Sequence, residues 1–165
     1  MHSTILIFLD GVGIGKSDPS INPFFKYPFK TFTELFGETP SLEKQKISKD
    51  GRFIFPTDAI MDIPDLPQSG TGQTSIFCGV NAARIVGHHF GPFPHSSLVS
   101  IIKIQNIFQQ FKKIKKKVTF VNAYPKVFFE YIESGKKRLS VTSLSCMLSN
   151  VPLKGVTELR KGEAL

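Results

Sequence analysis

Several residue types and patterns that would assign this chain to a broad class of protein are absent from its sequence. The 165 residues contain no tryptophan and only two cysteines, Cys78 and Cys146, too few for a small disulfide-stabilised secreted domain. No apolar run approaches the roughly 20 residues that span a bilayer. The apolar segment Thr4–Leu9 has no basic region before it and is cut short by Asp10, so it predicts neither a signal peptide nor an anchor. We therefore expect a cytoplasmic protein with free, buried thiols and no membrane partner.

Metal-ligating residue types are also missing from much of the chain. The last aspartate is Asp65 and the last histidine is His95, so the final 70 residues contain neither type. Charge is uneven as well: residues 1–100 hold eight Lys and Arg against nine Asp and Glu, whereas residues 101–165 hold thirteen against four. The overall charge is +8 and 41% of the residues are hydrophobic, as in an ordinary folded domain. The length predicts one domain or part of a larger one.

The order of apolar runs and breakers predicts an α/β fold with a largely parallel sheet. Continuous apolar runs predict buried strands at Thr4–Leu9 and Val118–Val121. Residues 15–68 hold seven prolines and are expected to be irregular, with short strands or turns at such places as Phe53–Phe55 and Ala59–Met61. The spacing of apolar residues predicts helices over residues 72–85, 98–114, 124–132, 142–148 and 156–165.

The segment Asp10-Gly11-Val12-Gly13 follows the first predicted strand, at the end where ligands collect in open α/β sheets. A carboxylate here suits a hard cation, and it is equally consistent with a turn residue that bonds its own backbone. Two nucleotide-binding motifs nearly fit. A P-loop ending at Gly15-Lys16-Ser17 would need glycine in place of Asp10, and a dinucleotide fingerprint would need glycine in place of Lys16. The sequence therefore argues against both motifs.

A run of small hydroxyl and glycine residues, Gln68–Ser75, leads directly into a predicted helix. A serine or threonine at a helix N-terminus lies in a positive field that favours an alkoxide or a phosphate. Such a residue suits a nucleophile for phosphoryl transfer. The alternative is an ordinary helix N-cap, a role in which hydroxyl residues are common. The spacing of these residues leaves both interpretations open.

Two other groups of titratable residues are candidates on weaker grounds. The histidines His88, His89 and His95 lie in a loop rich in Gly and Pro, where they could bind metal or phosphate or cap backbone groups. The lysines of residues 112–117 close a predicted helix, where solvated cations complement the helix dipole. Nucleic-acid binding is the alternative for these lysines. The run has no interleaved aromatic residue and no recognised motif, which argues against a nucleic-acid partner.

Five motifs span nearly the whole chain: Ile7–Gly13, Pro67–Ser75, Gly79–Arg84, Gly87–Pro94 and Val121–Pro125. In this order, and with the specific run Pro-Gln-Ser-Gly-Thr-Gly-Gln-Thr, the chain resembles the alkaline-phosphatase-like metalloenzymes. That superfamily includes cofactor-independent phosphoglycerate mutase and phosphopentomutase, and the resemblance is closest to an uncharacterised bacterial branch. It implies a three-layer αβα fold with a largely parallel sheet.

The resemblance also implies an activity, that of a metal-dependent phosphatase or phosphomutase with two divalent ions, Mn or Zn, and a phosphorylated small-molecule substrate. In the family, the aspartate after the first strand holds a metal, and Asp10 matches it. The mutases place a nucleophilic Ser or Thr three residues before a Gly that is followed by His. Ser69 stands at this spacing, with Gln73 in place of the histidine, so it is the implied nucleophile and a metal ligand. The other implied site residues are the alternative nucleophile Thr71 and the substrate contacts Gln73, Asn81, Arg84 and His89.

The family completes its metal site with Asp and His ligands well downstream of the nucleophile, in Asp-x-x-x-His and Asp-His pairs. Because no Asp follows Asp65 and no His follows His95, these ligands are missing from this chain. We therefore expect residues 1–165 to be the N-terminal portion of a single family domain without its C-terminal half, inactive alone and at most a weak metal binder. A second chain could supply the missing half. Alternatively, the chain is a catalytically inactive binding module or remnant on the same scaffold.

Overall fold

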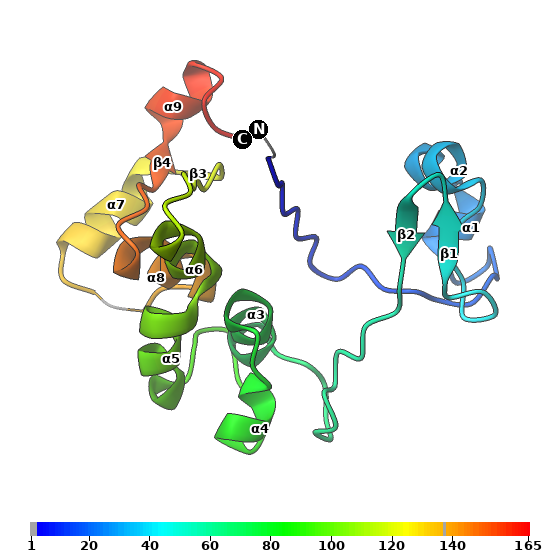
Figure 1. Cartoon of the computed structure of the whole chain (residues 1–165), viewed down its shortest axis with the longest axis horizontal. Coiled ribbons are helices and arrows are strands. Elements are labelled where there is room, and N and C mark those ends of the chain that lie inside the picture. The colour runs from blue at the N-terminus through cyan, green and yellow to red at the C-terminus, as the bar shows by residue number, and fades with distance from the viewer. Residues whose placement is uncertain (1–2, 137) are drawn as a thin grey trace. The chain divides into compact units, whose positions relative to one another are not determined.

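The computed structural model describes residues 3–136 and 138–165. The protein is a mixed α/β structure with about 40% helix and small sheets, which confirms the predicted class (Figure 1). The chain divides into two compact units, Met1–Asp58 and Ala59–Leu165. Within the described ranges, no helix has the length and apolar character needed to cross a membrane.

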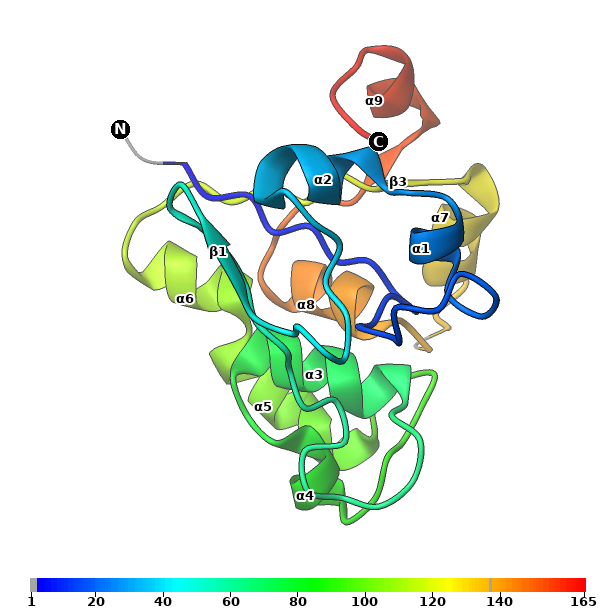
Figure 2. The ribbon, with the colours of Figure 1, turned by 90° about the vertical axis from the view of Figure 1, so that its right-hand side faces the viewer.

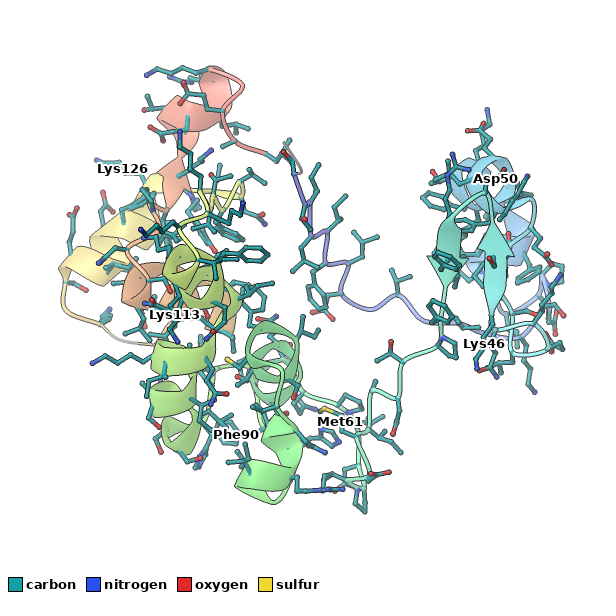
Figure 3. The ribbon with its side chains drawn as sticks, viewed as in Figure 1. Lys46, Asp50, Met61, Phe90, Lys113 and Lys126 are labelled. Carbon is teal, nitrogen blue, oxygen red and sulfur yellow. The ribbon has the colours of Figure 1, made fainter. Side chains whose placement is uncertain are left out.

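The first unit is built from short local elements. These are α1 (Pro23–Lys26), α2 (Lys30–Phe36), β1 (Ile47–Lys49) and β2 (Arg52–Ile54). The strands form an antiparallel hairpin around Asp50 and Gly51, whose φ angles of 50° and 75° suit an Asp-Gly turn. Figure 3 labels Asp50 at this turn. Phe24, Phe29 and Phe32 meet edge to face, with ring centroids 5.2 to 5.7 Å apart, yet neither helix buries a residue.

The predicted strand at Thr4–Leu9 is wrong. Among the described residues, no backbone ladder includes this segment. Its apolar side chains are exposed, from 44% at Phe8 to 84% at Ile5. A strand takes its hydrogen bonds from a neighbouring strand, and neither strand of the first unit pairs with these residues. Apolar, β-branched composition therefore favours a strand without supplying the partner that a strand needs.

The second unit is mainly helical. Its elements are α3 (Ser69–Cys78), α4 (Ala82–Val86), the 3₁₀-helix η1 (Ser96–Leu98), α5 (Val99–Gln105), α6 (Ile107–Lys113), β3 (Ala123–Tyr124), α7 (Lys126–Glu133), α8 (Val141–Leu148), β4 (Lys154–Gly155) and α9 (Val156–Arg160). Helices α3, α5 and α8 pack on one another (Figure 2). The core between the elements consists of Phe77, Ala82, Leu98, Ile102 and Val141. Helices α7 and α8 confirm the predictions over residues 124–132 and 142–148.

Three predicted helices differ from the observed ones, because two of them are each divided into two helices and the third is shorter. The helix predicted over residues 72–85 is split into α3 and α4 at Gly79, which adopts a left-handed φ of 67°. The helix predicted over residues 98–114 is split into α5 and α6 at Asn106, whose side chain accepts a hydrogen bond from the Gln109 amide and caps α6. The helix predicted over residues 156–165 ends at Arg160, just before Gly162 with a φ of 72°.

The second unit also contains a small parallel sheet. Strand β3 pairs with β4, with Ala123 opposite Lys154. On the other side of β3, the Leu165 amide donates to the Val121 carbonyl and the Leu165 carbonyl accepts from the Ala123 amide, each over 2.8 Å. This is the bonding pattern of a parallel neighbour. The predicted strand at Val118–Val121 is therefore wrong in position, because the strand itself is Ala123–Tyr124. The described residues form two two-stranded sheets, and a larger parallel sheet stays a prediction.

Candidate functional site

Ser69 is the first residue of α3, a ten-residue helix. Its side chain is half-buried, and its hydroxyl has no hydrogen-bond partner among the described residues. Among the described residues, the amide N–H groups of Ser69 and Gly70 have no acceptor either. The first helical hydrogen bond of α3 runs from the Gly72 amide to the Gln68 carbonyl over 2.8 Å. A free hydroxyl therefore lies beside two free amides at the positive end of a helix dipole.

A loop from the Gly- and Pro-rich segment packs against this helix end. The Thr71 amide donates to the Phe90 carbonyl over 2.9 Å, and the Phe90 amide donates to Thr71 Oγ1 over 3.2 Å (Phe90 is labelled in Figure 3). A Cβ on Gly70 would lie 2.6 Å from the Phe90 carbonyl oxygen and would also clash with the Phe93 carbonyl oxygen. Glycine at position 70 is therefore what allows the loop to approach so closely.

Gly91 lies close to the two unbonded amides, of which that of Gly70 belongs to a buried residue. A Cβ at this position would lie 3.1 Å from the Ser69 nitrogen and 3.3 Å from the Gly70 nitrogen. The absence of a side chain at residue 91 thus leaves clear the space beside both amides.

Thr71 differs from Ser69 because it is fully buried and its hydroxyl accepts from the Phe90 amide. The geometry therefore favours Ser69 over Thr71 as a group that can reach a ligand.

Three residues predicted to contact substrate hold the chain's own segment Met61–Ile63. Asn81 Nδ2 donates to the Met61 carbonyl over 2.8 Å. The Arg84 guanidinium lies 3.2 Å from the Asp62 carboxylate in an exposed ion pair. His89 Nε2 lies 3.1 Å from the Ile63 carbonyl oxygen. Because these tethers act on three consecutive residues, they fix the path of the chain that leads into α3.

The tethered segment is a tight turn in an unusual conformation. The Ile63 amide donates to the Ile60 carbonyl over 2.9 Å, and the two residues between them, Met61 and Asp62, have φ angles of 52° and 59°. Two successive left-handed residues define a turn that favours Gly, Asn and Asp. Met61, labelled in Figure 3, has no such advantage, and a left-handed conformation costs roughly 1–2 kcal/mol for an ordinary residue. The three tethers offset this cost.

Asp10 belongs to the first unit. Its side chain is exposed and makes no hydrogen bond or ion pair within the described residues. The next residue, Gly11, turns the backbone with a φ of 71°. Gly11 also lines a shallow hollow of about 280 Å³, together with Gly13, Gly15, Lys16 and other residues of the first unit. The Asp10 carboxylate is therefore free to bind a cation, as predicted for a metal ligand, and the metal itself stays a prediction.

Few side chains of the second unit are free to act as metal or substrate ligands. The Ile63 carbonyl can only accept, so His89 Nε2 carries the hydrogen and the other ring nitrogen, Nδ1, is buried without a partner among the described residues. A histidine whose other ring N–H is held by a carbonyl has the orientation seen in metal ligands. Gln73 is half-buried and also unbonded in the described structure. No three His, Cys, Asp or Glu side chains of the described residues are grouped to hold a metal.

The two cysteines are free thiols, as predicted. Burial raises the pKa of Cys78 from its ordinary 9.0 to about 11, and that of Cys146 to about 12. Both thiols therefore stay protonated at neutral pH. Since the thiolate is the nucleophilic form, neither cysteine competes with Ser69 for a covalent role.

Two features of the site were not predicted from sequence. From sequence, position 91 belongs to the motif Gly87–Pro94 without a role of its own, although a glycine before a proline is a general signal of a turn. The tethers to Met61–Ile63 had no sequence signal, because they join residues about 20 positions apart. Comparisons with protein-family models, curated proteins and solved structures find no match for this chain. The family resemblance therefore rests on the motifs alone.

Proposed function

We propose that Ser69 is the nucleophile of a phosphoryl-transfer site, in a metal-dependent enzyme of the phosphatase or phosphomutase type that acts in the cytoplasm. The observation that supports it is the unbonded Ser69 hydroxyl beside the unbonded amides of Ser69 and Gly70. Such amides donate readily to phosphate oxygens. No side chain at residue 91 stands against these amides, and the fully buried Thr71 is the weaker candidate nucleophile.

The proposed reaction begins with attack of Ser69 Oγ on the phosphorus of a phosphate monoester. A new O–P bond forms as the bond to the ester oxygen breaks, and the serine proton ends on the departing alcohol. The Ser69 and Gly70 amides stabilise charge on the non-bridging oxygens. The phosphoserine then passes its phosphoryl group to water in a phosphatase, or to a second hydroxyl in a mutase. Gln73 lies on the same helix, one turn after Ser69, and its proposed role is to contact the substrate.

The proposal includes the three-layer αβα architecture of the alkaline-phosphatase-like superfamily. Its support is the parallel pairing of β3 with β4 and of Leu165 with β3, the pattern that a larger parallel sheet extends. Residues 1–165 would then form part of one such domain.

Two divalent metal ions, Mn or Zn, belong to the proposed chemistry, with Asp10 and Ser69 among their ligands. Two oxygen ligands do not by themselves fit a two-metal site. The sequence has no Asp beyond Asp65 and no His beyond His95 to add to them. We therefore propose that groups outside residues 1–165 supply the remaining ligands, and that these residues alone bind metal weakly and turn over little substrate.

Phosphate binding is tested first, because it needs no metal. We expect inorganic phosphate to shift the ¹⁵N–¹H resonances of Ser69 and Gly70 in the wild-type chain. Gly91→Ala should abolish these shifts, because its methyl group would fill the space beside both amides. Gly72→Ala is the matched control, since a Cβ there meets nothing within 4 Å. Shifts that survive Gly91→Ala would contradict the proposed phosphate site.

Covalent chemistry is tested with an aryl phosphate and Mn²⁺, followed by peptide mass mapping of the phosphorylated residue. We expect a phosphoryl group on Ser69, absent in Ser69→Ala and retained in Thr71→Val if the variant folds. Phosphorylation of Thr71 instead would show that the nucleophile is misassigned. Rapid multiple turnover by the chain alone would show that its metal site is complete.

A non-catalytic binding module on the same scaffold is the second candidate function. The observation that favours it is the use of Asn81, Arg84 and His89 to hold Met61–Ile63, which occupies groups that a substrate would need. This candidate predicts phosphate binding at the Ser69 and Gly70 amides with no phosphoserine under any metal. The two experiments above therefore separate the enzyme from the binding module.

A further inference from the structure

The second unit carries all of the protein's net charge of +8. The first unit has seven Lys and Arg and seven Asp and Glu, whereas the second has fourteen against six. Residues 66–129 contain no acidic residue at all but include eight Lys and Arg. None of the ion pairs found among the described residues involves a lysine between positions 103 and 117. These lysines are therefore not neutralised by nearby carboxylates.

One lysine of this group has a structural role. Lys112 Nζ donates to the Ser149 carbonyl over 2.5 Å and to the Asn150 carbonyl over 3.0 Å. From the same helix, Gln109 Nε2 donates to the Leu148 carbonyl over 2.9 Å. Helix α6 thus caps the carboxyl end of α8, and Lys112, although exposed like the rest of the lysine run, also bonds to that end of α8. These bonds also fix where α6 and the lysines after it lie on the unit.

Two exposed isoleucines lie next to the remaining lysines. Gln110 Nε2 and Lys113 Nζ both donate to the Ile104 carbonyl, over 3.1 and 3.3 Å, so both side chains lie on the side of α6 nearest Ile104. Ile114 is four residues after Gln110 and shares that side. Ile104 is 59% exposed and Ile114 is 62% exposed. Apolar side chains are therefore presented to solvent among cations such as Lys113, which is labelled in Figure 3.

The end of α6 is a tight cap that contains a lysine where glycine is usual. The Lys116 amide donates to the Phe111 carbonyl over 3.0 Å and the Lys115 amide to the Lys112 carbonyl over 2.9 Å. This pair of bonds is the Schellman motif, which favours glycine at the left-handed position. Lys115 holds that position with a φ of 58°. The cap thus orders the backbone of the lysines that follow Ile114.

We infer that this surface docks on an anionic lipid bilayer. We define the lysine face as Ile104, Lys113, Ile114 and the lysines of residues 115–117. Clustered lysines are attracted to the negative headgroups of a cytoplasmic leaflet, and exposed aliphatic side chains enter the boundary between headgroups and acyl chains. This inference is independent of the Ser69 chemistry. It departs from the expectation of no membrane partner, which rested on the lack of a membrane-spanning run and does not bear on docking at a membrane surface.

The chemistry of the lysine face favours lipid over nucleic acid. Proteins that bind single strands without sequence preference stack bases on aromatic side chains, and arginine supports this stacking. The lysine face contains neither aromatic residues nor arginine. Two exposed isoleucines would add nothing to contacts with the phosphates of a nucleic acid. They suit the boundary between headgroups and acyl chains of a membrane.

The test is co-sedimentation of the full chain with vesicles of phosphatidylcholine alone or with about 30 mol % phosphatidylserine. We expect binding only to the anionic vesicles, weakened by added salt. Replacing Lys113 and Lys115–Lys117 together by Gln should lower the apparent affinity on the order of 100-fold. The matched control replaces four lysines of the first unit by Gln, Lys16, Lys26, Lys30 and Lys46. It removes the same charge and should change the affinity little.

A second pair of variants tests the isoleucines. Ile104→Ser with Ile114→Ser should lower vesicle affinity roughly 10-fold, whereas Ile5→Ser with Ile7→Ser, also exposed, should not. Equal losses in both lysine variants, or in both isoleucine variants, would overturn the assignment of this face. So would equal binding to phosphatidylcholine alone. Binding of single-stranded poly(U) without any vesicle binding would replace lipid by nucleic acid as the partner.

Discussion

The two units carry the same number of phenylalanines, eight each, but use their apolar residues differently. In the first unit, Ile47 is the one buried side chain among the described Ala, Val, Ile, Leu, Met, Phe and Tyr residues. The second unit buries a continuous core around Leu98, Ile102 and Val141. The phenylalanines of the first unit contact near neighbours in sequence, as in the Phe24, Phe29 and Phe32 cluster. Apolar content therefore does not make a core unless elements distant in sequence present apolar faces to one another.

The largest expected effect contrasts the core of the second unit with the exposed start of the first. Ile102→Ala should lower the free energy of unfolding by about 2–5 kcal/mol, since the fully buried side chain leaves a cavity. Ile104→Ala, on the same helix but exposed, and Ile7→Ala in the first unit should each change it by less than about 0.5 kcal/mol. Urea denaturation of each variant measures these differences. A large loss for Ile7→Ala would show that the first unit has a core after all.

The next effect concerns the close approach at the start of α3. Gly70→Ala should destabilise the chain by about 1–3 kcal/mol, because its Cβ would collide with the Phe90 and Phe93 carbonyls. Gly72→Ala should instead stabilise it by about 0.5–1 kcal/mol, since the position is helical and open. Thermal melts of both variants measure the difference. Equal melting temperatures would mean that the loop of residues 90–93 does not lie against α3.

A smaller effect is expected at the tether of the Met61 turn. Asn81→Ala removes the N-cap of α4 and the bond to the Met61 carbonyl, at a cost of about 1 kcal/mol. Asn81→Asp should keep the cap, whose acceptor oxygen remains, while losing the donated bond. Limited proteolysis between the two units should then be faster in both variants. Protection equal to that of the wild type would show that the tether does not hold the turn.

The smallest effect is chemical and appears only at high pH. Because burial raises the thiol pKa values in the folded chain, folding stability is unaffected below the ordinary value of 9.0 and declines as pH rises toward about 11 and 12. At pH 8, labelling by a thiol reagent should be slow for both cysteines and slower for Cys146 than for Cys78. Mass spectrometry of the labelled peptides measures the order. Rapid labelling of Cys146 would show that α8 is not packed as described.

Local chemistry predicted several features correctly. The mixed α/β class, α7, α8 and the free thiols followed from apolar spacing, capping residues and cysteine count. The Asp-Gly turn of the first hairpin likewise has a local signal, because Asp50-Gly51 is a typical hairpin pair. Helix α3, by contrast, begins at Ser69, three residues before the predicted start at residue 72. The class, α7, α8, the thiols and the turn depend on residues close in sequence, so the sequence alone contained their cause.

The remaining features depend on partners. Thr4–Leu9 has the composition of a buried strand, but a strand exists only where a neighbour supplies hydrogen bonds, and no composition can supply it. Asn81, Arg84 and His89 have the residue types of a substrate site, and tertiary contacts join them to Met61–Ile63, while their contact with a substrate stays a prediction. The availability of Ser69, in contrast to Thr71, was likewise decided by the loop that packs on α3. Sequence determined which groups could do chemistry, and tertiary packing decided which of them remained free, because a hydrogen bond to one partner leaves fewer for another.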